Sequence, residues 1–153
     1  MTIEARKNAF TSEAEAVAII RAAQFWPMTF DIAAGVLTDH WHEFGAIVCV
    51  LDGEITITLS KTSESCIVKA GTQIFIEAGT LHNERTDGCR VAFGFGVDPA
   101  TLTHPINKPP QLTVGDVRYI APRPNVLSRA SGWNPSIQGS TPRREQVPAL
   151  ADA

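Results

Sequence analysis

The spacing of hydrophobic positions changes near Pro27. Before it, an alanine-rich stretch carries apolar residues at helical spacing, and Ser12 is followed three residues later by Glu15. This pair has the pattern of a capping box at a helix N-terminus. The sequence therefore predicts a helix from Ser12 to about Ala23, ended by Pro27, because the proline ring and its missing N–H interrupt a helix.

From residue 29 onward the period shortens to two. Apolar and polar residues alternate most clearly in residues 55–59 (ITITL), and Asp52-Gly53 has the composition of a hairpin turn. Asp87-Gly88 marks another turn. About seven short strands in some 70 residues predict an antiparallel sandwich or barrel. The predicted strands are 29–37, 40–51, 54–60, 64–69, 73–77, 80–86 and 90–97.

The same pattern divides the chain into three parts. We expect an N-terminal arm and helix over 1–28, a β-barrel over 29–104, and an irregular segment over 105–153. The last segment holds most of the ten prolines and shows little periodicity, so it cannot bury much apolar surface alone. We expect it to wrap the barrel, to cross to a second subunit, or to be partly disordered at its end.

Charge and cysteine content narrow the class of protein. The net charge of −3 argues against a nucleic-acid partner, and no run approaches 18 apolar residues, so no membrane span is expected. Residues 1–7 lack the apolar core of a signal peptide. The three cysteines, an odd number without metal-binding spacing, are expected to be reduced thiols. We therefore expect a cytoplasmic protein.

Three of the four histidines suggest a metal site. His40 and His42 are two residues apart in a predicted strand, so their side chains share one face. His82 lies in another predicted strand about forty residues later. Three neutral imidazoles that converge inside a barrel would form an open site for a divalent transition metal. The alternative is structural, with histidines held in the core by hydrogen bonds or as a cross-strand polar pair.

Two segments resemble the motifs of the cupin superfamily. Residues 35–53, GVLTDHWHEFGAIVCVLDG, resemble the first motif, G-x5-H-x-H-x3,4-E-x6-G. Residues 71–86, GTQIFIEAGTLHNERT, resemble the second, G-x5-P-x-G-x2-H-x3-N. The resemblance covers roughly residues 29–97. It implies a jelly-roll β-barrel of the cupin type, here with an N-terminal helix, and a metal site in its mouth held by His40, His42 and His82.

The departures from the motifs affect the expected chemistry. The glutamate of the first motif falls at Ala46, which lies on the histidine face, and the proline and asparagine of the second fall at Glu77 and Thr86. Without that glutamate, a divalent ion keeps its +2 charge and up to three open positions, which favours an anionic or bidentate ligand. Some cupin-like dioxygenases lack the glutamate and bind iron through three histidines. Fe(II) is therefore favoured, and Zn, Ni, Mn and Cu stay open.

Two neighbours of the histidines have expected roles. Glu84 follows His82 by two residues and shares its inward face, so we expect it to orient a ligand or to act as a general base. The alternative is an ion pair with Arg85 or Arg90. Trp41 faces away from the histidines. It is expected to lie at an interface, or to cover the helix or the tail, the irregular segment over 105–153.

The histidines, together with what the resemblance to cupins implies, suggest three classes of function. The leading one is a metal-dependent enzyme, an iron-type dioxygenase that acts on a small anionic or bidentate-chelating molecule. Lyase or isomerase chemistry at the same site, with Glu84 moving a proton, is a close alternative. A non-catalytic module that binds or senses a small ligand is the second class, and a metal-free structural barrel is the third. The resemblance and an exposed edge strand also suggest a homodimer.

Overall fold

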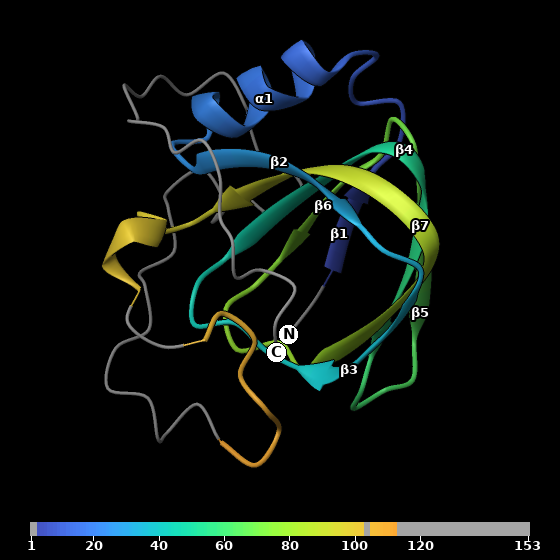
Figure 1. The fold of residues 1–153 in the computed structure, drawn as a ribbon, viewed down its shortest axis with the longest axis vertical. Helices are drawn as coiled ribbons and strands as arrows, with labels where there is room; N and C mark the ends of the chain where they lie inside the picture. The colour runs from blue at the N-terminus through green and yellow to red at the C-terminus, as the bar shows by residue number, and fades with distance from the viewer. Residues whose placement is uncertain (1–2, 103–104, 113–153) are drawn as a thin grey trace.

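The computed structural model describes residues 3–102 and 105–112 (Figure 1). Within them, one α-helix packs on an antiparallel arrangement of strands that curls into a barrel. No helix of these residues has the length and apolar character needed to cross a bilayer. The elements are β1 (Ile3–Arg6), α1 (Glu13–Ala22), β2 (Trp26–Ile32), β3 (Gly35–His40), β4 (Ala46–Leu59), β5 (Ser65–Lys69), β6 (Gln73–Ile76), β7 (His82–Phe95) and the 3-10 helix η1 (Pro99–Thr101).

Helix α1 begins at the predicted capping box. The Ser12 hydroxyl accepts a hydrogen bond of 3.1 Å from the backbone N–H of Glu15, and the Glu15 carboxylate accepts one of 2.7 Å from the N–H of Thr11. The prediction that Pro27 ends the helix is wrong. The helix ends at Ala22, where the chain turns through Gln24 with a φ of 66°, and Pro27 lies within β2.

The hairpin predicted at Asp52-Gly53 and the turn predicted at Asp87-Gly88 are both wrong. The chain bends at both places and continues, so β4 and β7 are long antiparallel partners of 14 residues each. The bends face one another, because Gly53 pairs with Cys89. Gly53 has a φ of 78°, and a Cβ there would lie 2.5 Å from the carbonyl oxygen of Gly88. Glycine therefore allows the two bent strands to approach closely.

The bends divide the sheet into two halves. On one side the strand order is β1-β6-β4-β7-β2, and on the other β5 pairs with β4 while β3 pairs with β7. Figure 1 shows β4 and β7 curving through both halves. This arrangement confirms the predicted fold class, an all-β jelly-roll barrel of the cupin type with an N-terminal helix. The sequence missed β1 and joined β2 and β3 into one strand.

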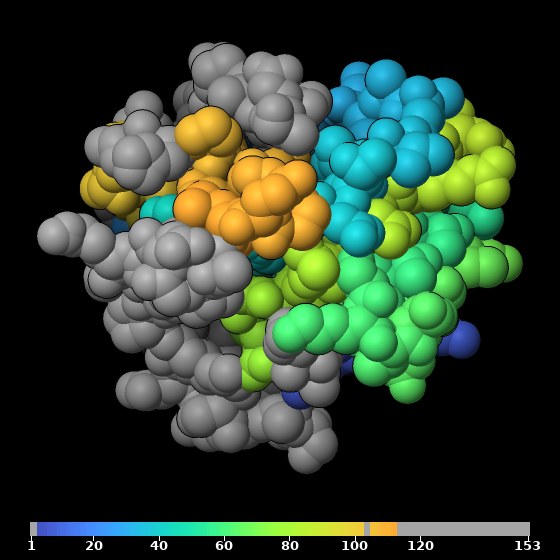
Figure 2. Space-filling view, turned by 90° about the horizontal axis from the view of Figure 1, so that it is seen from below, coloured from blue at the N-terminus to red at the C-terminus, as the bar shows by residue number. Residues whose placement is uncertain are grey.

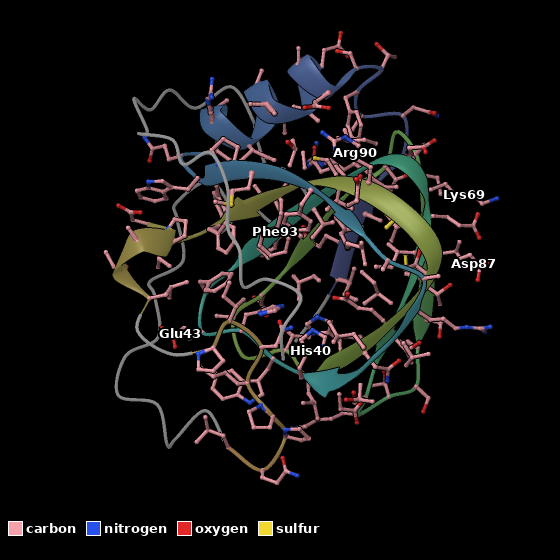
Figure 3. The ribbon with its side chains drawn as sticks, in the orientation of Figure 1. His40, Glu43, Lys69, Asp87, Arg90 and Phe93 are labelled. Atoms are coloured by element: carbon pink, nitrogen blue, oxygen red, sulfur yellow. The ribbon has the colours of Figure 1, made fainter. Side chains whose placement is uncertain are left out.

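The hydrophobic core has two parts, one on each face of β4. Val48 and Val50 point into the barrel, whereas Ile47 and Cys49 pack beneath α1. The predicted alternation of faces along this strand is therefore confirmed. Figure 3 shows Phe93 inside the barrel and Lys69 and Asp87 at its outer edge.

The first residues of the proline-rich segment lie against the barrel. Trp41 and Lys108 exchange two backbone hydrogen bonds, of 3.0 and 2.8 Å, and the indole N–H of Trp41 donates to the carbonyl of Leu112 at 2.7 Å. Figure 2 shows residues 105–112 in orange beside the cyan β2–β3 region. The expectation that Trp41 covers the tail is confirmed for these residues. Residues 113–153 lie outside the described part of the chain, and the division at 28 and 104 stays a prediction.

Candidate metal centre

The barrel brings the three histidines together from two strands and a loop. His40 ends β3 and pairs directly with His82 at the start of β7. The register of β3 shifts between Leu37 and His40, so a bulge turns His40 inward beside its partner. His42 was predicted within a strand but lies in the loop that precedes β4. All three side chains are buried.

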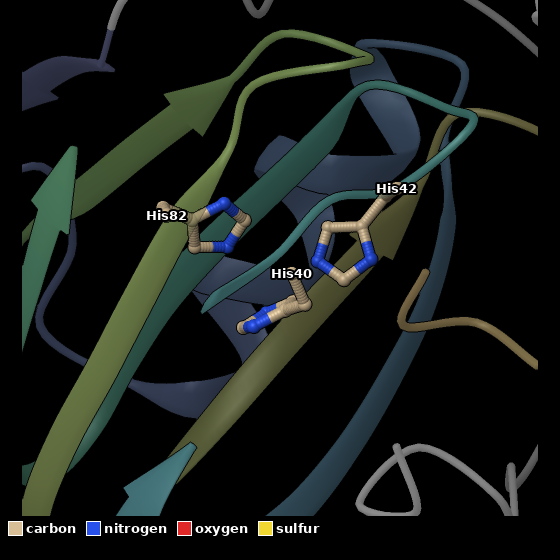
Figure 4. A group of neighbouring side chains, drawn as sticks. All are labelled: His40, His42 and His82. Carbon is tan, nitrogen blue, oxygen red and sulfur yellow. The ribbon is translucent and has the colours of Figure 1, made fainter. Parts of the chain in front are cut away.

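The three rings face a common point (Figure 4). The ring centroids of His40 and His82 are 4.3 Å apart, and those of His42 lie 5.1 Å from His40 and 5.3 Å from His82. One nitrogen of each ring lies within 4.8 Å of the corresponding nitrogens of the other two. The predicted trio is therefore one cluster.

The backbone fixes the same tautomer in all three rings. Each Nδ1 lies within hydrogen-bonding distance of a carbonyl oxygen, and a carbonyl can only accept, so each Nδ1 carries the proton. Each Nε2 then has a free lone pair, which is the state that a metal ligand requires. The hydrogen bonds run from His40 to Thr38 at 2.7 Å, from His82 to Thr80 at 2.8 Å and from His42 to Ile106 at 3.1 Å.

Two of these lone pairs have no hydrogen-bond donor. The Nε2 atoms of His40 and His82 are buried without a hydrogen-bond partner. The nearest charged group is the carboxylate of Glu84, whose Oε2 lies 3.6 Å from His40 Nε2 and 3.4 Å from His82 Nε2. Both distances exceed a hydrogen bond. Buried, unpartnered imidazole nitrogens that converge from three sides fit a divalent transition metal ion.

Burial and mutual charge set the protonation of the cluster. Burial, together with the smaller effect of the neighbouring imidazoles, lowers the pKa of His42 to about 3. Burial also acts to lower the pKa of His40, but the adjacent Glu84 outweighs it and raises that pKa. Burial would raise the pKa of Glu84, yet the His40 and His82 rings hold it well below its usual range. His42 is thus neutral and Glu84 ionised at neutral pH.

A polar cluster on the outer side fixes the ends of the strands that carry His40 and His82. Asp39 accepts hydrogen bonds from the Ser60 hydroxyl at 2.8 Å and from the Asn83 amide at 2.9 Å. Asp39 and Asn83 directly adjoin the two histidines in the chain. These bonds therefore hold β3 and β7 together at the level of the imidazoles.

A cavity of about 360 Å³ opens beside the histidines. Its wall is mostly apolar, and polar groups come from Asp31, His42, Glu84, Thr86 and Asn107. No lysine or arginine of the described residues lines it. A ligand here would meet an apolar wall on most sides, with His42 and Glu84 as its contacts to the histidine cluster.

The structure also tests two expectations about carboxylates near the histidines. Glu84 lies beside the imidazoles, and Arg90 instead contacts Asp31 at 3.2 Å and Glu13 at 3.5 Å. Ala46 is fully buried and points into the barrel core, so no carboxylate enters from the first-motif position.

The sequence missed the contribution of the tail. The Ile106 carbonyl fixes His42, and Asn107 lines the cavity. Both belong to a proline-rich segment without periodicity, and the contact to His42 spans 64 residues. No local pattern marks such a contact.

Comparison with known proteins identifies one family. Residues 28–93 match the family model described as a cupin domain. Among curated proteins, no sequence matches the chain.

Several solved structures are similar in shape. A DUF861 family protein from Thermotoga maritima is 8% identical with a TM-score of 0.47, and the match covers 61% of this chain and 99% of that one. A cupin superfamily protein from Desulfitobacterium hafniense is 14% identical with a TM-score of 0.41, covering 46% and 64%. A putative ethanolamine utilization protein Q from Salmonella typhimurium is 16% identical with a TM-score of 0.43, covering 64% and 72%. At these values we carry no function over from them.

Proposed function

Residues 28–93 form a cupin domain, and from this premise we propose that the protein is a metal-dependent enzyme for a small chelating molecule, with iron-type dioxygenase chemistry favoured. One observation carries the proposal. Three buried imidazoles converge with their Nδ1 protons fixed by backbone carbonyls, which leaves three Nε2 lone pairs directed at one another.

His40, His42 and His82 would hold the metal. Neutral imidazole suits iron, and it also suits zinc, nickel and copper, with manganese a further candidate. When bound, an iron ion supplies Lewis-acid and redox chemistry toward a chelating substrate and dioxygen. The histidine ligands are rigid because each is fixed through its second nitrogen. Of the three, His42 also lines the cavity, together with Glu84.

The cavity wall narrows the class of substrate. Because the wall is mostly apolar and no lysine or arginine of the described residues lines it, a highly charged molecule has no counter-charge there. The fitting substrate has an apolar body and a single anionic or bidentate head, such as a carboxylate, a thiolate or an enediol-like oxygen pair. The head would lie at the histidines and the body against residues such as Phe30, Ile55 and Phe93.

Proton-transfer chemistry is the second candidate. Glu84 lines the same cavity and is ionised, which is the form of a general base. A lyase or isomerase reaction at the same centre would use this carboxylate to take a proton from the bound molecule. It would consume no oxygen.

The test combines metal loading with a small panel of chelators. Protein reconstituted with Fe(II) without oxygen is mixed with a catechol, a mercapto acid or an enediol, and oxygen is then admitted. Oxygen uptake with product formation supports the dioxygenase. Chemical change without oxygen uptake supports lyase or isomerase chemistry, and tight binding without change supports a ligand-binding or sensing module. Failure to bind any of Fe, Zn, Ni, Mn or Cu would refute the metal-dependent enzyme.

A homodimer and a cytoplasmic location complete the proposal. Strand β5 pairs only with β4 among the described residues, so its outer edge is open to another strand. Ile67 on that strand is 54% exposed. Light scattering of the full chain, compared with that of an Ile67→Lys variant, tests whether a second copy pairs at this edge.

A further inference from the structure

We propose that Glu84 is a fourth protein ligand of the metal, taking the place of the glutamate that the cupin motif would supply at position 46. The inference rests on the proposed metal centre. It changes the ligand set from three imidazoles to three imidazoles and one carboxylate, with the carboxylate coming from β7 instead of β4.

The distances around Glu84 are those of donors that share an ion. Two atoms that each lie about 2.1 Å from one metal are about 3.0 Å apart at a right angle and about 3.4 Å apart at a tetrahedral angle. Glu84 Oε2 lies 3.4 Å from His82 Nε2 and 3.6 Å from His40 Nε2. These spacings are too long for hydrogen bonds but close to those between two ligands of one ion.

The strand delivers this carboxylate to the site. Glu84 follows His82 by two residues in β7, so both side chains project from the same face. In the sheet it is flanked by Leu37 of β3 and Ile57 of β4, which are apolar. The side chain keeps 17% of its surface, on the side where it lines the cavity. Its position is therefore set by regular strand geometry.

An enclosed carboxylate needs a positive partner. Burying an ionised group without one is costly. Of the two arginines expected to pair with Glu84, Arg90 contacts Asp31 and Glu13 instead, and Arg85 is exposed on the opposite face of the strand. The two groups that Glu84 does meet are imidazoles whose backbone contacts keep one nitrogen free. A divalent cation between them would neutralise the carboxylate and occupy both lone pairs.

The usual position of the glutamate is closed in this chain. Ala46 is fully buried, and its partners across the sheet are Phe95 and Ile76. Phe44 and Phe95 pack with ring centroids 5.3 Å apart in the same part of the core. A carboxylate there would need space that these rings occupy.

The fourth ligand has a consequence for the substrate. With one carboxylate bound, a divalent ion carries a net charge of +1, and a six-coordinate ion keeps two open positions in place of three. A bidentate, singly charged head fills both positions and balances the charge. The proposal therefore favours a bidentate monoanion as the substrate head over a dianion.

The experiment measures metal binding by the full chain, without any substrate. Zn(II) affinity is obtained by competition with a chromophoric chelator, and the visible absorption of bound Co(II) reports the ligand set. The variants are Glu84→Gln, which removes the charge, and Glu84→Asp, which keeps it but shortens the side chain. Glu54→Gln is the control, because Glu54 is an exposed carboxylate of β4 beside the bend. Circular dichroism checks that each variant folds.

We expect Glu84→Gln to weaken Zn(II) binding by more than about 100-fold, the upper end of what loss of a group outside the ligand set costs. The Co(II) bands should shift in Glu84→Gln and Glu84→Asp and stay unchanged in Glu54→Gln. A Co(II) spectrum that is unchanged in both Glu84 variants overturns the ligand role, even if affinity falls. Wild-type affinity in Glu84→Asp also overturns it, because the carboxylate would then act through charge alone.

Failure of the metal centre itself gives a different result. If the wild-type protein binds neither Zn(II) nor Co(II), the proposed function fails together with this inference. If the wild type binds both metals and the Glu84 variants bind them equally well, only the role of Glu84 is refuted, and the three-histidine centre stands.

Discussion

The Nδ1–H of His42 donates a 3.1 Å hydrogen bond to the carbonyl oxygen of Ile106, 64 residues further along the chain. His40 and His82 are fixed by carbonyls only two residues away, so their orientation is a local property of their own strands. His42 instead depends on how residues 105–112 lie against the barrel. The histidine cluster and the start of the proline-rich segment are therefore structurally connected.

The first prediction concerns the ion pair that holds this segment. Lys108 is 3% exposed, and its ammonium lies 3.2 Å from the carboxylate of Glu43. Lys108→Met would leave Glu43 without its partner, and loss of one member of a buried pair costs about 3–5 kcal/mol. Because Glu43 is partly exposed, we expect the lower end of that range in the free energy of unfolding, measured with urea.

The same variant should also weaken the metal site. If the segment shifts, the Ile106 carbonyl no longer orients His42, and loss of such a contact costs about 10–100-fold in metal affinity. The double variant Lys108→Met/Glu43→Gln is the control, since it removes both charges and should recover much of the stability. Unchanged zinc affinity in a destabilised Lys108→Met protein would show that the tail and the metal site are independent.

The sequence predicted which face of a strand a side chain occupies more reliably than it predicted where the chain turns. Alternation correctly placed Ala46 of β4 on the inner face, because side-chain direction in a strand depends only on the period of two. The dipeptide Asp52-Gly53 misled because a glycine with positive φ serves a bulge as well as a hairpin. Whether a bulge or a hairpin forms at Gly53 depends on the pairing of β4 with β7. A short stretch of sequence does not show which strand will be the partner.

The candidate site likewise contains residues that the sequence predicted and a residue that it did not. The histidines could be found from their i, i+2 spacing and from the motifs, although His42 lies in the loop before β4 and not in the predicted strand. The role of Ile106 could not, because the group involved is a backbone carbonyl and carries no residue signature. Glu84 was found from its inward face, but its distance from two Nε2 atoms depends on the pairing of β3 with β7.

The second prediction concerns the facing bends of β4 and β7. Gly53→Ala would put a Cβ 2.5 Å from the Gly88 carbonyl oxygen at a residue with a φ of 78°. We expect a loss of about 1–3 kcal/mol in the free energy of unfolding, from strain and from separation of the strands. Gly88→Ala is the matched control. Its φ of 117° is also strained, but no atom lies within 4 Å of the added Cβ, so its loss should be smaller. Equal losses would remove the steric part of the argument.

The third prediction is a dependence of stability on pH in the metal-free protein. Burial lowers the pKa of His42 to about 3, against about 6.5 in the unfolded chain. Between these values the unfolded chain binds a proton that the folded protein does not, so the free energy of unfolding falls as the pH decreases from about 6.5 toward 3. We expect a loss of several kcal/mol from this group over that range.

A variant separates His42 from the carboxylates that also titrate in acid. His42→Leu removes the imidazole and keeps an apolar side chain of similar size, so its unfolding energy should fall less steeply between pH 6.5 and 4.5. Urea denaturation of both proteins with chelator present gives the two slopes. Parallel slopes would contradict a buried, neutral His42.

The last prediction tests the cavity as the substrate site. Ala34 is exposed and lines the cavity in the turn between β2 and β3, so a larger side chain there can obstruct the cavity without disturbing the core. Ala34→Trp should weaken binding of a chelator with an apolar body, such as an alkyl catechol, by about tenfold or more. Unsubstituted catechol should bind nearly as before, and zinc affinity should not change, because the histidines are untouched. Calorimetry on zinc-loaded protein measures all three. Equal weakening of both catechols would show that the substrate body lies elsewhere, since only a body that extends along the apolar wall meets the indole.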